Sequence, residues 1–110
     1  MARYLFQFSY TPEAWAALIK NPVDRRPGIQ ALAEKTGGRL IEFSYAFGEY
    51  DGIAIFEAPD ETAMTAAILT AIGPGHLKAT KTTVLIPVEQ ALEAMRTAGG
   101  LTYQAPSAQR

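Results

Sequence analysis

The segment Gly48-Glu49-Tyr50-Asp51-Gly52 places an aromatic hydroxyl beside a carboxylate at a predicted loop. Tyr50 could donate a proton or a hydrogen bond, and Asp51 could accept one. Neighbours in an extended strand point to opposite faces, so the pair would cooperate only if the turn rotates one of them. The alternative is a structural role in a tight hairpin turn, where Asp and Gly tolerate positive φ. The flanking glycines favour the turn, and a rigid turn could also carry a site.

His76 is the only histidine, so a metal site built on two histidines is excluded within one chain. Its imidazole could act as a general base near neutral pH. It could also be a surface residue at a strand start, or by fold analogy alone a haem ligand. The chain has no cysteine and hence no thiolate site. We therefore predict no metal and no cofactor, and take Tyr45, Tyr50, Asp51 and His76 as the candidate ligand-binding residues.

Charged residues supply two further candidates. Lys20, Arg25 and Arg26 form a small basic cluster that is either solvated surface or a clamp for an anionic ligand, because guanidinium groups pair bidentately with carboxylates and phosphates. Two acids, Glu42 and Glu57, lie inside predicted strands, where an unpaired charge on a packed face is costly. We expect them to pair with an arginine such as Arg3 or Arg39, or to meet a ligand.

The elements that must position these residues follow from periodicity and breakers. Apolar residues alternate over 3–10, 39–47, 53–58 and 77–86, which predicts four strands. Helices are predicted from Thr11-Pro12-Glu13 to Asn21, from Arg25 to Gly37, and from Asp60 to Gly73, with a short amphipathic helix after Pro87. The order β-α-β-β-α-β plus a C-terminal helix predicts an α+β, ferredoxin-like fold with an antiparallel four-stranded sheet. A single domain would span 1–98, followed by a flexible tail at 99–110.

The predicted strands are apolar on both faces. Ile53 and Ile55 point to one side of their strand, while Ala54, Phe56 and Ala58 point to the other. Helices can cover one face, and an uncovered apolar face favours association. We therefore expect two sheets to pack face to face in a dimer. The alternative is that the C-terminal helix folds back over the open face.

Aromatic side chains are concentrated on the predicted sheet, where they either pack the core or line an apolar pocket for an aromatic small molecule. The row comprises Tyr4, Phe6, Phe8, Tyr10, Phe43, Tyr45 and Phe47.

The chain resembles the GYD-domain family, small bacterial and archaeal proteins named for a Gly-x-Tyr-Asp motif. Here the motif is Gly48, Tyr50 and Asp51, supported by the strand running into Thr11, by Gly37-Gly38, and by Glu57-Ala58-Pro59-Asp60. The resemblance covers about residues 4–86 and leaves the C-terminal helix outside. It implies a ferredoxin-like, dimeric α/β-barrel-type fold, and it implies little about function.

Composition narrows the function classes. A formal charge of −1 argues against a dedicated nucleic-acid binder, and neither a membrane span nor a signal peptide is recognisable, so we expect a cytoplasmic protein. The favoured function is a homo-oligomeric small-molecule-binding or assembly module. The alternative is a cofactor-independent isomerase, lyase or oxygenase acting on a small apolar or aromatic substrate. Tyr45, Tyr50, Asp51 and His76 would then transfer protons or orient the substrate, which requires them to converge on one cavity.

Overall fold

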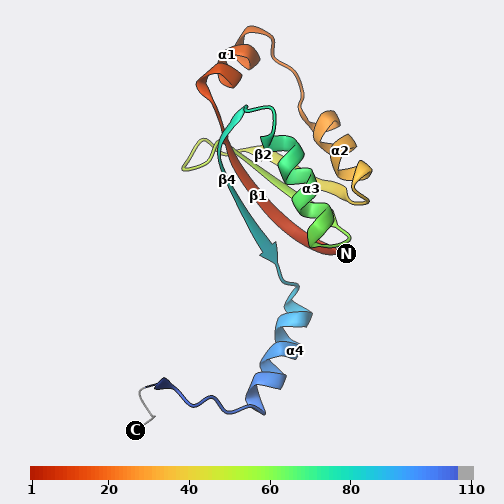
Figure 1. Cartoon of the computed structure of the whole chain (residues 1–110), viewed down its shortest axis with the longest axis vertical. Helices are drawn as coiled ribbons and strands as arrows, with labels where there is room; N and C mark the ends of the chain where they lie inside the picture. Colours follow the sequence, from red (N-terminus) through yellow and green to blue (C-terminus); the bar gives the residue numbers. More distant parts are fainter. Residues whose placement is uncertain (107–110) are drawn as a thin grey trace.

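The computed structural model describes residues 1–106 and confirms the predicted β-α-β-β-α-β order with an added C-terminal helix (Figure 1). The elements are β1 (Ala2–Tyr10), α1 (Pro12–Lys20), α2 (Arg26–Lys35), β2 (Arg39–Tyr45), β3 (Gly52–Ala58), α3 (Glu61–Ile72), β4 (Leu77–Leu85) and α4 (Val88–Gly99). Within the described residues, no helix has the length and apolar character needed to cross a membrane.

The predicted capping residues start two of the helices. The Thr11 hydroxyl accepts a hydrogen bond from the Ala14 amide at 3.1 Å at the start of α1. The Asp60 carboxylate accepts one from the Ala63 amide at 2.8 Å at the start of α3. Each cap satisfies a backbone donor that lacks a partner within its helix. Both helix starts are therefore fixed by the local sequence.

The sheet is antiparallel, with strand order β2-β3-β1-β4, and one of its faces carries the core. The central strands β1 and β3 provide most of the buried side chains, and α1, α2 and α3 each contribute residues packed against them. The buried strand residues are Tyr4, Phe6, Phe8 and Tyr10 of β1 and Ala54, Phe56 and Ala58 of β3. Core packing is thus confirmed for the aromatic row of β1.

Two irregularities change the faces predicted from strict alternation. The β2–β3 register shifts between Leu40 and Glu42, which puts Leu40 on the core face together with Phe43. The β1–β4 register shifts at Tyr10, so Leu77 packs on the core while Ala79 pairs with Ser9 on the opposite face. The predicted sharing of a face by Leu77 and Ala79 is wrong, because each bulge adds a residue and reverses the parity of the strand.

The second face of the sheet has no helix over it. Its apolar residues include Leu5 in β1, which is registered against Ile55 in β3, as well as Ile53 and Leu85. These side chains are half-buried by their neighbours in the sheet. The apolar character predicted for both sheet faces is therefore present.

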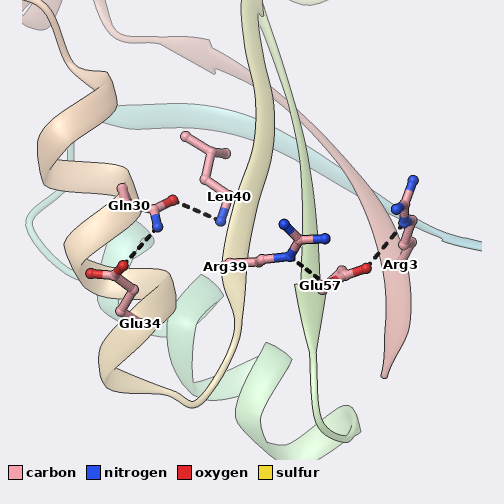
Figure 2. Close-up of polar contacts among 6 residues, drawn as sticks. All are labelled: Arg3, Gln30, Glu34, Arg39, Leu40 and Glu57. Carbon is pink, nitrogen blue, oxygen red and sulfur yellow. Dashed lines mark hydrogen bonds and ion pairs between the residues drawn. The ribbon is translucent and has the colours of Figure 1, made fainter.

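The open face also carries a three-residue ion pair across adjacent strands (Figure 2). Arg3 Nε lies 3.2 Å from one carboxylate oxygen of Glu57, and Arg39 Nε lies 2.8 Å from the other. Pairing with Arg3 or Arg39 is thus confirmed for Glu57. Glu42 instead accepts a hydrogen bond from the Ser44 hydroxyl at 3.2 Å.

Glu57 should make folding stability depend on pH in the acidic range. The two arginines, Arg39 above all, hold the pKa of its carboxyl below 4.5 in the folded protein. The stabilisation is therefore present above pH 4.5 and is lost as the pH falls through the lowered folded value. Urea unfolding at a series of pH values should show the unmodified protein losing more stability on acidification than Glu57→Gln. Parallel pH profiles for the two proteins would contradict this role.

The C-terminal helix α4 projects away from the domain, beyond the end of β4 (Figure 1). None of its residues is buried, and the molecule measures 63 × 31 × 22 Å. The alternative prediction, that this helix folds back over the open sheet face, is therefore wrong. The linker explains the direction of α4, since Pro87 is extended (φ −58°, ψ 146°) and a residue that precedes a proline is also held extended.

Candidate ligand-binding site

The hairpin connection between β2 and β3 is present, but it is not the predicted primed turn. Residues 46–51 form the connection, and the positive-φ residue in it is Phe47 (φ 54°) rather than Gly48 or Gly52. The Ala46 amide donates to the Asp51 carbonyl at 2.8 Å, and the Gly48 amide donates to the Tyr50 carbonyl at 3.2 Å. The motif glycines therefore do not serve as left-handed turn residues.

Asp51 acts as a structural anchor for three elements. Its Oδ2 accepts a hydrogen bond from the Tyr10 amide at 3.0 Å and another from Trp15 Nε1 at 2.9 Å. The Asp51 amide donates to the Phe8 carbonyl at 2.9 Å, and beyond this point the chain leaves the edge of β1. The carboxylate then supplies the acceptor that a continuing strand would have offered to Tyr10, and it ties α1 to the hairpin.

Gly52 has a packing role next to this anchor. A Cβ at this position would lie 2.3 Å from the ring of Phe8, closer than real side-chain contacts allow. The absence of a side chain lets the Phe8 ring lie directly over β3. The Asp-Gly pair of the motif therefore combines a polar anchor with a space for an aromatic ring.

The two tyrosines predicted as site residues lie at the hairpin. Tyr50 is half-buried, and Tyr45 is 40% exposed. The Tyr45 ring stacks on Phe47 at a centroid distance of 5.8 Å and contacts Trp15 at 5.9 Å. These side chains build an aromatic cluster at the end of the sheet.

A cavity of about 280 Å³ lies on the core face, between the sheet and the helices α2 and α3. Its walls are mostly aromatic and aliphatic, and polar side chains are few. The principal apolar lining residues are Phe6, Phe8, Phe56, Ile29, Leu32 and Ile68. Three side chains that can form hydrogen bonds or carry charge also line it: Tyr10, Arg25 and His76. Arg25 and His76 are exposed and therefore stand at its opening.

Tyr10 is held in its neutral form. Burial, followed by its interaction with Tyr45, raises the pKa of the Tyr10 phenol to about 12, although the nearby Arg25 opposes the shift. At neutral pH the hydroxyl therefore keeps its proton and can act as a hydrogen-bond donor. Arg25 reaches this end of the cavity because its guanidinium lies over Gly28, at the start of α2.

The structure separates the residues that the sequence grouped as candidates. His76 lines the cavity, whereas Tyr45, Tyr50 and Asp51 are not among its lining residues. No cluster of three or more metal-ligating side chains occurs within residues 1–106. Of the basic cluster, Arg25 lies at the cavity while Arg26 pairs with Asp24 at 2.8 Å. Sequence reasoning missed Tyr10 as a site residue, although its position at the end of an aromatic strand was a usable signal.

The sheet order and the helices on one face define a ferredoxin-like α+β fold, and solved structures support this class. FFRP-DM1 aligns with a TM-score of 0.55 and 17% identity, over 78% of this chain and 100% of that one. MtbAldR aligns with a TM-score of 0.57 and 12% identity, over 78% of this chain and 53% of that one. TTHA0845 from Thermus thermophilus aligns at 0.52 and 12%, over 79% and 95% of the two chains. At these identities the likeness concerns the fold alone.

The chain belongs to the GYD-domain family, whose model matches residues 4–95. The match extends past the range recognised in the sequence and takes in most of α4, which the sequence resemblance left outside. No curated protein matches the chain. The arm-like α4 is thus largely within the family domain.

Proposed function

We propose that this protein is a homo-oligomeric small-molecule-binding module whose ligand is an apolar or aromatic compound with an acidic group. The observation that carries the proposal is the cavity between α2, α3 and the sheet. Apolar walls with a few convergent polar groups are typical of small-molecule sites. A volume of about 280 Å³ suits a small ligand.

Arg25 supports the acidic group. Within the described residues it has no ion pair with a carboxylate, whereas its neighbour Arg26 is engaged by Asp24. A guanidinium at the opening of an apolar cavity can take a carboxylate bidentately while the rest of the ligand enters the cavity. The neutral Tyr10 hydroxyl and the His76 imidazole line the same cavity and offer further hydrogen bonds.

The open sheet face supports the homo-oligomer. Leu5, Ile53, Ile55 and Leu85 form an apolar face without a covering helix, and face-to-face packing of two copies would bury it. This face lies opposite the cavity, so such a dimer leaves the ligand site accessible. Light scattering at micromolar concentration should give a dimer mass or higher. A clean monomer would contradict the oligomer.

The Arg25 contact can be tested with a matched pair of ligands and variants. Isothermal titration of 3-phenylpropionate should show binding, and its neutral amide should bind more weakly. Arg25→Gln should weaken acid binding about 10–100-fold, because a hydrogen bond to a charged group contributes about 1.5–3 kcal/mol. Arg26→Gln is the matched control and should bind like the unmodified protein.

A cavity-filling variant tests the location independently of charge. Ala71 is a half-buried lining residue of α3, and Ala71→Leu should reduce binding of both the acid and the amide. Equal affinity of all three variants and the unmodified protein would place the site elsewhere. The enzyme alternative stays a prediction, because His76 does not share the cavity with Tyr50 or Asp51.

A further inference from the structure

Two exposed apolar surfaces of the chain have no partner in the domain. The first, here called the arm, is the stripe of Val88, Leu92 and Met95 on α4, which are 69%, 43% and 64% exposed. The second, here called the groove, lies between α1 and the β2–β3 hairpin. It is lined by Trp15, Leu18, Ile19, Val23, Tyr45 and Phe47.

The arm needs a partner to be stable. Its stripe has the i, i+4, i+7 spacing of a helix that packs on an apolar surface. A helix of 12 residues is marginal in water without tertiary contacts, and α4 also lacks a side-chain cap at its start. Because nothing in α4 is buried, the contacts that hold it must come from outside the domain described above.

The groove has the character of a docking surface. Ile19 is 74% exposed and Phe47 is 69% exposed, which is unusual for large apolar side chains that lie next to one another. The concave space between α1 and the hairpin measures about 290 Å³ and is almost wholly apolar. It is therefore suited to the side chains of an apolar helix stripe.

The arm and the groove cannot meet within one chain. Figure 1 places α1 and the hairpin at one end of the long axis and α4 at the other. The axis is 63 Å long, and the short linker at Ile86 and Pro87 is held extended. Docking of this arm on this groove must therefore be intermolecular.

We propose that the arm of each copy docks in the groove of a second copy. Each chain carries one arm and one groove, so a twofold dimer satisfies both at once, with the same contact made twice. The charges next to the two surfaces are complementary, since Glu89 follows the first arm residue and Lys20 follows Ile19 of the groove. An unrelated partner would have no reason to match both surfaces.

The size of the interface supports exchange of arms. The open sheet face spans about 30 Å along the strands and about 19 Å across them, so packing two of them would bury on the order of 1,000 Å². Stable interfaces bury about 1,200–2,000 Å² in total. Two arms, each about 18 Å long, would bring the dimer into that range. Arm exchange also leaves the cavity under α2 and α3 free.

Disulfide trapping tests the contact directly, because the chain has no cysteine of its own. Leu92→Cys and Ile19→Cys would be prepared separately, mixed and oxidised, with the tail of one variant tagged to mark mixed dimers. We expect a covalent mixed dimer to form. Leu69→Cys is the control partner for Leu92→Cys, since Leu69 is 62% exposed but lies on α3. Trapping no stronger with Ile19→Cys than with Leu69→Cys would overturn the proposal.

A charge variant gives a second readout without a new bond. Leu92 is 43% exposed, so Leu92→Glu should leave the far-ultraviolet circular dichroism of the domain intact. Sedimentation equilibrium should show the dimer dissociation constant raised about 100-fold or more, because each arm would bring an unpaired charge into an apolar groove. Binding of 3-phenylpropionate should be retained. An unchanged dimer would overturn arm exchange, as would a monomeric unmodified protein, and neither outcome would affect the ligand site.

Discussion

Asp51→Ala should lower the free energy of unfolding by about 3 kcal/mol. The variant removes the acceptor for two part-buried donors, the Tyr10 amide and the Trp15 indole N–H. Hydrogen bonds to charged groups contribute about 1.5–3 kcal/mol each, and losses of neighbouring bonds are not simply additive. Urea denaturation followed by Trp15 fluorescence measures the loss and reports on the same contact.

The matched control for this variant is Glu49→Ala, two residues earlier in the same connection. Glu49 is exposed, and surface substitutions of this kind usually change stability by less than about 0.5 kcal/mol. Asp51→Asn keeps an acceptor oxygen but loses the charge, so it should fall between the two. If Asp51→Ala were as stable as Glu49→Ala, the carboxylate would not be the anchor described here.

Gly38→Ala should be at least as damaging, for a purely steric reason. A Cβ at Gly38 would lie 1.9 Å from the backbone carbonyl oxygen of Glu57, and a backbone atom cannot move aside as a flexible side chain can. Relief requires β2 to move away from β3 at the point where α2 hands over to the sheet. Overpacking commonly costs about 1–3 kcal/mol and occasionally more, and we expect the upper end.

Gly48→Ala is the control for Gly38→Ala. A Cβ at Gly48 meets nothing within 4 Å, and its φ is not positive, so this substitution should be tolerated. Thermal unfolding of the two variants should separate them clearly. Equal melting temperatures would show that β2 and β3 do not approach as closely as the structure indicates.

Much of the fold could be predicted from the sequence because its determinants are local. Thr11 and Asp60 cap helices with their own side chains, and proline and glycine mark most of the element ends. The pairing of Glu57 with Arg3 and Arg39 was predictable because a charge inside a strand needs a partner. The strand order follows from the order of the elements.

The remaining features depend on contacts between distant residues. The two bulges move Leu40 and Leu77 onto the core face, and no alternation pattern in one strand reveals them. Asp51 looked like a proton acceptor because its partners, Tyr10 and Trp15, lie about 40 residues earlier. The cavity likewise joins Tyr10, Arg25 and His76 from three separate segments.

The ligand site is tested most directly by mapping amide chemical shifts while 3-phenylpropionate is titrated into the ¹⁵N-labelled protein. The cavity account predicts shifts concentrated at the start of α2, around Gly28 and Ile29, and at the end of α3 near His76. The motif segment Gly48–Gly52 should change little. Shifts concentrated at Tyr50 and Asp51, with α2 and α3 unaffected, would contradict the account and return the site to the hairpin.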